Sequence, residues 1–147
     1  MDKTFKIISI TFLRRTTATL LCGIALLTTS ACAKGCYTDE NMQPLAATAT
    51  DLARAVMRFA KDNPSEAASL DDQELVRRAT AFDPNLLESY KGLVVRGTVD
   101  GVILVCTSDG KRGLFEDAEC SDKVDKPVWP DKTAPCAFTL KVKSICP

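Results

Sequence analysis

The sequence predicts an α+β fold in which two to three N-terminal helices pack on one face of a roughly four-stranded antiparallel sheet, stabilised by disulfides. In the first part of the folded region apolar residues recur every three to four positions, as in helices that bury one side. From Leu93 onward they recur every second position, and turn-forming pairs such as Asp-Gly separate the runs. Helices followed by strands are the order of an α+β domain.

The first 31 residues have the order of a secretory signal peptide. A basic head carries Lys3, Lys6 and the pair Arg14-Arg15, and the uncharged run 16–31 follows it. This run is shorter and richer in threonine than a membrane span, which needs about 20 mostly apolar residues. An uncleaved anchor is the weakest alternative, because both arginines would then lie in the membrane at about 2.5–3.5 kcal/mol each.

The uncharged run ends in Thr29-Ser30-Ala31-Cys32, which resembles the lipobox of bacterial lipoproteins, although Thr29 stands where that family usually has leucine. The resemblance implies cleavage before Cys32, a diacylglycerol group on its thiol and acylation of the new amino terminus. Several acyl chains give stable membrane anchoring. In Gram-negative lipoproteins an aspartate after the cysteine favours the inner membrane. Here that residue is Ala33, so the resemblance implies the outer membrane in preference to the inner one.

A second cleavage site overlaps the first. Ala31-Cys32-Ala33 fits the small-x-small pattern that an ordinary signal peptidase recognises. Cleavage after Ala33 would release a periplasmic or secreted protein that has no lipid anchor. Both possibilities place the folded region outside the cytoplasm, in a compartment where disulfides persist.

Composition narrows the classes of function. The chain has 19 basic and 19 acidic residues, and removing the first 31 leaves 15 basic and 18 acidic, a net charge of −3. A slightly acidic domain that has no basic stripe is a poor nucleic-acid binder. The chain contains no histidine, which excludes histidine triads, histidine general bases and histidine metal ligands. We expect no cofactor and no enzymatic activity.

The lipidated residue is expected to be followed by a polar tether over 32–43 and by one domain over 44–147, a usual domain size. The segment Pro44 to Lys61 is predicted to be a helix, ended by Asp62-Asn63-Pro64. Its apolar stripe consists of Leu45, Ala49, Leu52, Val56 and Phe59. We expect this stripe to pack in the core in preference to lying on a membrane.

A second and a third helix are predicted before the sheet. Ser69 is expected to begin the second helix as its cap. The inward-facing residues of that helix are expected to be Leu75, Ala79 and Phe82. Asp83-Pro84 then begins a short third helix over Asn85 to Lys91, which Gly92 ends.

The first two strands are expected at Leu93 to Val99 and Val102 to Thr107, joined by Asp100-Gly101 as a two-residue hairpin turn. This register pairs Val99 with Val102, Gly97 with Leu104, and Val95 with Cys106.

After a second turn, a third strand is predicted over Lys111 to Glu116. It would place Phe115 opposite Leu104 and Gly113 opposite Cys106. The prolines of the segment 116–135 predict a loop. The alternating segment Cys136 to Cys146 is predicted to be the fourth strand.

Strand geometry limits the disulfide pairing. Cys136 and Cys146 would lie about 33 Å apart on one extended strand, far beyond the roughly 4.4–6.8 Å between bonded α-carbons. Cys120 and Cys136 bracket the proline loop and form the favoured pair. Cys106 and Cys146 fall at the same end of the sheet and form the second expected pair. Cys36 is then the possible free thiol, unless it bonds to the domain and leaves another cysteine over.

The predicted loop carries five carboxylates, at Glu116, Asp117, Glu119, Asp122 and Asp125. It lacks the Asp-x-Asp-x-Asp-Gly spacing of a calcium loop. We therefore expect a solvated acidic surface and no metal site.

Trp129 is the only tryptophan of the chain and lies on the proline-stiffened loop. Exposed there, it would be a possible partner contact, since tryptophan is enriched in binding hot spots. Packed against the sheet, it would be a core residue, which is the favoured interpretation.

These observations predict a small exported lipoprotein of the cell envelope, with a binding or structural role and a possible protein partner in the envelope. A released inhibitor or effector protein is the alternative. An enzyme that uses carboxylates or the Cys36 thiol is less favoured, because no catalytic pattern accompanies these residues.

Overall fold

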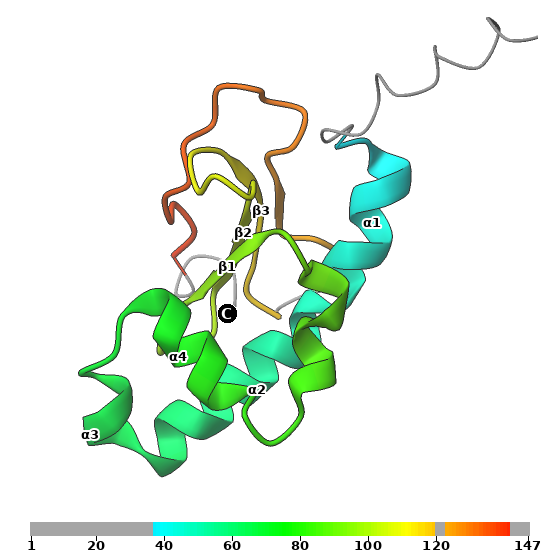
Figure 1. Cartoon of the computed structure of the whole chain (residues 1–147). Coiled ribbons are helices and arrows are strands. Elements are labelled where there is room, and N and C mark those ends of the chain that lie inside the picture. Colours follow the sequence, from blue (N-terminus) through cyan, green and yellow to red (C-terminus); the bar gives the residue numbers. More distant parts are fainter. Residues whose placement is uncertain (1–36, 120–122, 142–147) are drawn as a thin grey trace, which may run out of the picture. The chain divides into compact units, whose positions relative to one another are not determined.

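The computed structural model describes residues 37–119 and 123–141 (Figure 1), and all of these lie in the compact unit Cys36–Pro147. Helices come first along the chain, and a four-stranded antiparallel sheet of order β1-β2-β3-β4 follows. The predicted α+β class is therefore confirmed.

Two helices, α1 (Asp39–Ala47) and α2 (Ala49–Asp62), replace the single helix expected from Pro44. The break falls at Thr48, whose hydroxyl donates to the Leu45 carbonyl at 2.8 Å. The Tyr90 hydroxyl lies 2.7 Å from the same Thr48 oxygen and donates to the Leu45 carbonyl at 2.9 Å. Residues 39–43, expected in the tether, are therefore helical and belong to the folded domain.

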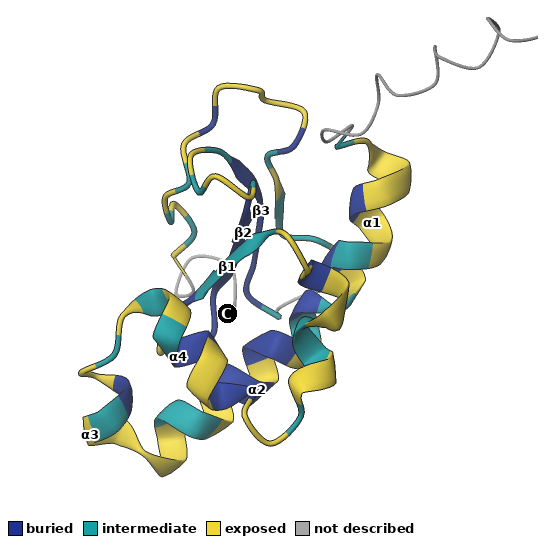
Figure 2. Ribbon diagram, viewed as in Figure 1, coloured by how far each residue is buried: buried dark blue, intermediate teal, exposed yellow. Residues whose placement is uncertain are grey.

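Helix α2 packs its apolar stripe into the core, as the sequence predicts. Leu52 and Val56 are fully buried, while Arg54 and Arg58 on other sides are exposed. Figure 2 shows this side of α2 in dark blue, together with the buried strands β2 and β3. Burying one such aliphatic side chain contributes roughly 1.5–3 kcal/mol, so this stripe anchors the helical layer.

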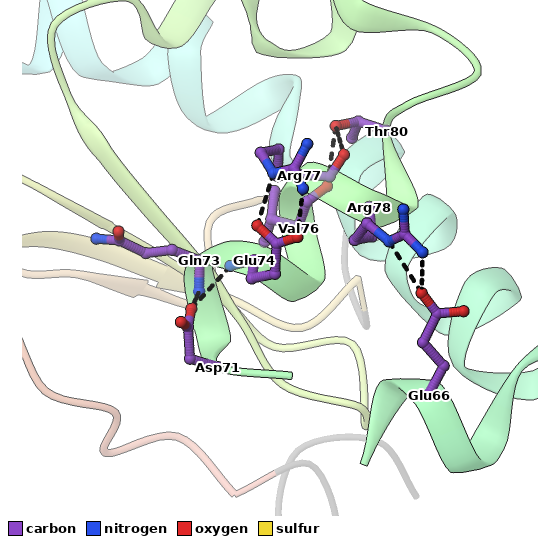
Figure 3. Close-up of polar contacts among 8 residues, drawn as sticks. All are labelled: Glu66, Asp71, Gln73, Glu74, Val76, Arg77, Arg78 and Thr80. Atoms are coloured by element: carbon purple, nitrogen blue, oxygen red, sulfur yellow. Dashed lines mark hydrogen bonds and ion pairs between the residues drawn. The ribbon is translucent and has the colours of Figure 1, made fainter. Parts of the chain in front are cut away.

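A short helix α3 (Pro64–Ala67), absent from the sequence prediction, precedes α4 (Asp72–Ala79). The cap of α4 is Asp71, not Ser69: its carboxylate accepts from the backbone N–H groups of Gln73 and Glu74 at 3.0 and 2.8 Å (Figure 3). Phe82, expected to point inward, lies beyond the end of α4 and is 67% exposed.

The third helix is the 3-10 helix η1 (Pro84–Tyr90), which begins where the sequence predicts. Asp83 accepts a hydrogen bond from the Asn85 N–H at 3.1 Å. Gly92 follows with a φ of +78°, which glycine adopts without the strain that a Cβ brings. This short element leads directly into the first strand.

The first hairpin joins β1 (Val94–Gly97) to β2 (Ile103–Cys106) in a register one residue away from the predicted one. Gly97 pairs with Ile103, not with Leu104. The loop contains three residues in place of two, because the Gly101 N–H donates to the Thr98 carbonyl and Gly101 has a φ of +86°. A type I turn followed by a left-handed glycine is a common three-residue hairpin connection.

The shift reverses the faces of β2 relative to β1, since neighbouring strand residues point to opposite sides. Ile103 and Val105 face the helices and belong to the main core cluster, and the partly buried Val95 packs against it. Gly97 lies on the same face, where an added Cβ would stand 2.8 Å from the Val76 side chain of α4. A glycine is therefore required for α4 to approach β1 this closely.

Strand β3 (Gly113–Asp117) pairs with β2 across a β-bulge. The expected pairing of Cys106 with Gly113 is confirmed. The pairing of Leu104 with Phe115 is wrong, because the bulge places Glu116 opposite Leu104.

Strand β4 is Lys126–Pro127, which takes the fourth place in the sheet inside the expected loop. The predicted last strand begins at Cys136, but residues 136–141 adopt no strand. The chain instead returns at Pro135, which forms a bridge to Arg112. Residues 142–146 of that predicted strand lie outside the described residues.

Candidate functional site

The sheet face opposite the helices is covered by residues 136–141, which we name the C-terminal strap. Its first residue, Cys136, forms a disulfide with Cys106 of β2, with 5.7 Å between the α-carbons. The Cys136 N–H also donates to the Lys111 carbonyl at 3.0 Å. The disulfide therefore joins the strap to the centre of the sheet.

Both expected disulfide pairings are wrong in their partners. Cys136 was expected to bond Cys120, and Cys106 to bond Cys146, but the structure bonds Cys106 to Cys136. The reason is the bridge between Arg112 and Pro135, which brings the chain back beside the end of β2. Cys120 and Cys146 lie outside the described residues.

Glu116 connects the strap to the third strand. Its carboxylate is buried and accepts from the Thr139 N–H and hydroxyl and the Leu140 N–H at 2.6–2.7 Å. The Lys126 ammonium group of β4 lies 3.5 Å from the same carboxylate and forms an ion pair with it. Burial by itself would raise the pKa of Glu116, but the hydrogen bonds from Thr139 and Leu140 and the charge of Lys126 together lower it.

Arg96 of β1 connects the strap to the helical layer. Its guanidinium donates to Asp72 at the start of α4 at 2.7 Å and to the Cys136 carbonyl at 3.2 Å. The ring of Phe138 lies 5.8 Å from the guanidinium carbon, within the range of a cation–π contact. One side chain thus holds α4, β1 and the strap together.

A pair of carboxylates closes the loop between β3 and β4. Asp117 accepts from the Asp125 N–H at 3.3 Å, and Asp125 accepts from the Ala118 N–H at 2.8 Å. The second oxygen of Asp117, Oδ2, is buried and has no donor among the described residues. Burial, together with the nearby charge of Asp125, raises the pKa of Asp117 to about 6.

The charge of Asp117 acts on a neighbouring tyrosine. Burial raises the pKa of Tyr90 to about 12, and the negative charges of Asp117 and Asp51 act in the same direction. The guanidinium of Arg54 is engaged in ion pairs with Glu119 and Asp51. A proton on Asp117 would supply the missing donor and remove the charge of its buried carboxylate.

The prediction of a solvated acidic surface is therefore wrong for two of its five members. Glu116 and Asp117 are 1% and 2% exposed, because both continue the buried strand β3. Glu119 pairs with Arg54, and Asp122 lies outside the described residues. Among residues 37–119 and 123–141, no group of three or more Asp, Glu, Cys or His side chains is placed to hold a metal ion.

Trp129 is a core residue. It is 4% exposed, and its ring meets that of Phe115 edge-on, with 6.3 Å between the centroids. Its indole N–H donates to the Asp39 carboxylate at 2.6 Å. The possible partner contact at Trp129 is wrong, because this loop folds back onto the sheet and the start of α1.

The start of the described chain contacts the segments around Arg112 and Trp129. The ring of Tyr37 lies 5.0 Å from the guanidinium carbon of Arg112, which precedes β3. Together with the bond between Asp39 and Trp129, this contact holds the entry to α1 against the turn 107–112 and the segment 129–135.

Large apolar side chains are exposed at two places in the described part of the chain. Val99, in the loop of the first hairpin, is 47% exposed, and Met57 of α2 is 36% exposed. The two belong to one patch, because the Met57 side chain packs against Gly101 of the same loop. We name this patch, Met57 with Val99, the hairpin patch. Phe82 is exposed separately, after α4.

Other predicted site residues fall outside the described part of the chain. The lipidation site Cys32 and the possible free thiol Cys36 both precede Tyr37. In the part that is described, no helix is long and apolar enough to span a membrane.

Comparison with known protein families, with curated proteins and with solved structures found no match to this chain.

Proposed function

We propose that this protein is a small exported lipoprotein of the cell envelope, anchored through Cys32, whose folded domain has a binding or structural role. The observation that carries the proposal is the disulfide between Cys106 and Cys136. Disulfides persist in oxidising compartments and are rare in the cytosol. The bond therefore supports the export that the first 31 residues predict.

The binding role rests on the hairpin patch. Val99 and Met57 expose apolar surface on a hairpin loop, while the other apolar residues of the hairpin are buried or partly buried. Exposed apolar side chains that cluster are typical of interaction sites, whereas single ones are common on any surface. In the envelope the matching partner would be a protein surface with an apolar cleft.

Intact mass of the mature protein, from membrane and soluble fractions, tests the anchor. We expect a membrane-bound chain that begins at Cys32 with acyl groups attached. Non-reducing peptide mapping of the same sample should link the peptide of Cys106 to that of Cys136. A soluble chain that begins at Lys34 would contradict the lipoprotein proposal and favour the alternative, a released inhibitor or effector.

Photo-crosslinking in cells tests the binding role. A photoreactive residue at Val99 should give a discrete protein adduct, and the same residue at Asn63, an exposed position at the end of α2, should give none. Equal labelling from both positions would contradict a binding role for the hairpin patch.

A further inference from the structure

We propose that one end of the domain, formed by Tyr37, the turn 107–112 and the segment 129–135, rests against the lipid headgroups of the membrane. This membrane-proximal end is defined by the three described segments that gather around the entry to α1. The inference rests on the proposed anchor at Cys32, and it adds an orientation that the anchor alone does not specify.

The first step is the length of the stalk. Only Ala33 to Cys36 separate the lipidated residue from Tyr37, the first residue of the described domain. Five steps between consecutive α-carbons span at most about 18 Å when fully extended. A domain of this size is about 35 Å across. The stalk is therefore too short to bring the opposite end of the domain to the membrane.

The second step is the attachment of the domain at its first residues. The ring of Tyr37 packs on Arg112, and Asp39 accepts from the buried indole of Trp129 at 2.6 Å. Lengthening the stalk by unwinding the start of α1 would leave the Trp129 donor without its partner. Loss of a buried hydrogen bond to a charged group is unfavourable, so we expect the start of α1 to stay folded and to add no residues to the stalk.

The third step is the chemistry of this end. Lys111 and Lys132 are exposed there and form no ion pair within the described part of the chain. Their ammonium groups suit the phosphates of lipid headgroups. The acids Asp109 and Asp131 beside them accept hydrogen bonds within their own turns. The end is mixed in charge, so the short stalk, and not charge, sets the orientation.

The same orientation places the hairpin patch away from the membrane. Helices α1 and α2 follow one another away from the entry at Tyr37 (Figure 1), and Met57 lies in the second half of α2. At 1.5 Å per residue, Met57 is roughly 25 Å along these helices from Asp39. The apolar surface of Val99 and Met57 is then directed toward the space beyond the membrane, where a protein partner can reach it.

The single tryptophan of the chain provides a native probe of this orientation. The mature chain, with acylation of Cys32 verified by mass, is placed in vesicles of phosphatidylethanolamine and phosphatidylglycerol that contain a dansyl-labelled headgroup lipid. Energy transfer from Trp129 to the dansyl group is then measured. The matched variants W129F/K132W and W129F/V99W both lack the Trp129 donor and place the only tryptophan at the membrane-proximal end or at the hairpin patch. We expect transfer from the hairpin patch to be on the order of threefold weaker, because as much as about 25 Å of helix separates the two ends.

A second variant keeps Trp129 and the native domain unchanged. A Gly-Ser insert of about 12 residues after Gly35 adds about 20 Å of average reach and should weaken transfer from Trp129. Equal transfer from both tryptophan positions, or no effect of the insert, would overturn the proposed orientation while leaving the acylated anchor established. An unmodified Cys32 in the mass measurement would overturn both proposals together.

Discussion

The carboxyl groups of Asp117 and Asp125 close the loop between β3 and β4 through backbone N–H groups on its opposite sides. Asp117 Oδ1 accepts from the Asp125 N–H at 3.3 Å, and Asp125 Oδ2 accepts from the N–H of Ala118, the neighbour of Asp117, at 2.8 Å. Asp117 Oδ2 has no donor within the described residues. A proton on Asp117 makes this arrangement favourable, and its loss leaves a buried negative charge close to Asp125.

We expect the contribution of Asp117 to the free energy of unfolding to increase as the pH falls from about 7 toward 4. The pKa of Asp117 is about 6 in the folded state, above its ordinary value of 3.8. The stabilising contribution of its protonated form is thus complete below the unfolded pKa and is lost as the pH rises through about 6. D117N supplies a permanent donor in place of that proton. It should raise stability at pH 7.5 by on the order of 1–3 kcal/mol and flatten the pH dependence between 4 and 7.

Urea denaturation over a series of pH values measures both effects on stability. D100N is the matched control, since Asp100 is exposed in the hairpin loop, and it should keep the pH dependence of the native chain. A D117N variant that is less stable than the native chain at pH 7.5 would show that the charged form of Asp117 is needed.

The contribution of Glu116 to the free energy of unfolding should depend on pH in the opposite direction from that of Asp117. Its pKa is lowered in the fold from the ordinary value of 4.5, so its contribution is present above that value and is lost as the pH falls through the folded pKa. E116Q removes the charge that holds Thr139 and Leu140. We expect a loss of about 1–3 kcal/mol at pH 7 and faster hydrogen exchange at these two amides. The exposed variant E88Q is the control, and unchanged exchange in E116Q would contradict the role of Glu116 in holding the strap.

Removing the disulfide should destabilise the domain without abolishing its fold. The bond joins residues 30 apart in sequence, and closing a loop of this length contributes roughly 3–4 kcal/mol in the chain-entropy model. C106A/C136A should lose that amount in urea denaturation, and hydrogen exchange in residues 136–141 should increase. If peptide mapping links Cys136 to Cys120 or Cys146 in the native chain, the disulfide between Cys106 and Cys136 and the stabilisation expected from it would both be wrong.

Gly101 and Gly110 form a matched pair that separates backbone strain from steric conflict. Both have positive φ, +86° and +67°, but an added Cβ at Gly101 would lie 2.6 Å from Met57 Cγ, and one at Gly110 would meet nothing closer than 3.9 Å. G110A should cost about 1–2 kcal/mol from backbone strain alone. G101A should cost roughly 1–3 kcal/mol more, and M57A should remove that excess. Thermal denaturation of G110A, G101A, M57A and the double variant G101A/M57A measures this, and equal costs for the two glycines would contradict it.

Patterns within a few residues predicted where helices, strands and turns lie better than they predicted which distant segments meet. Tyr90 shows why the long first helix divides at Thr48: its hydroxyl arrives from a segment 42 residues away in sequence and meets Thr48 and Leu45 at the break. The first hairpin shows a similar limit. Asp100-Gly101 predicts a turn correctly, but the two-residue and three-residue loops use the same dipeptide, and they differ by one residue in register.

Only some residues of the candidate site could be predicted from the sequence. Glu116 and Asp117 directly follow Leu114-Phe115 in the printed sequence, so a strand extended by one residue would have predicted their burial on opposite faces. Arg96 gave no comparable signal, because its partners Asp72 and Cys136 come from two distant segments.

The sequence by itself determined the α+β class, the order of helices before strands, the end of α2 near Asp62, the start of η1 at Asp83-Pro84 and the positions of the turns. These follow from side-chain periodicity and from caps and glycines within a few residues of each other. Only the tertiary structure decided the sheet register, the disulfide partners, the burial of Trp129 and the closing of the Asp117–Asp125 loop. Each of these depends on which distant segments meet, and a shift of one residue in a strand reverses the face that every side chain occupies.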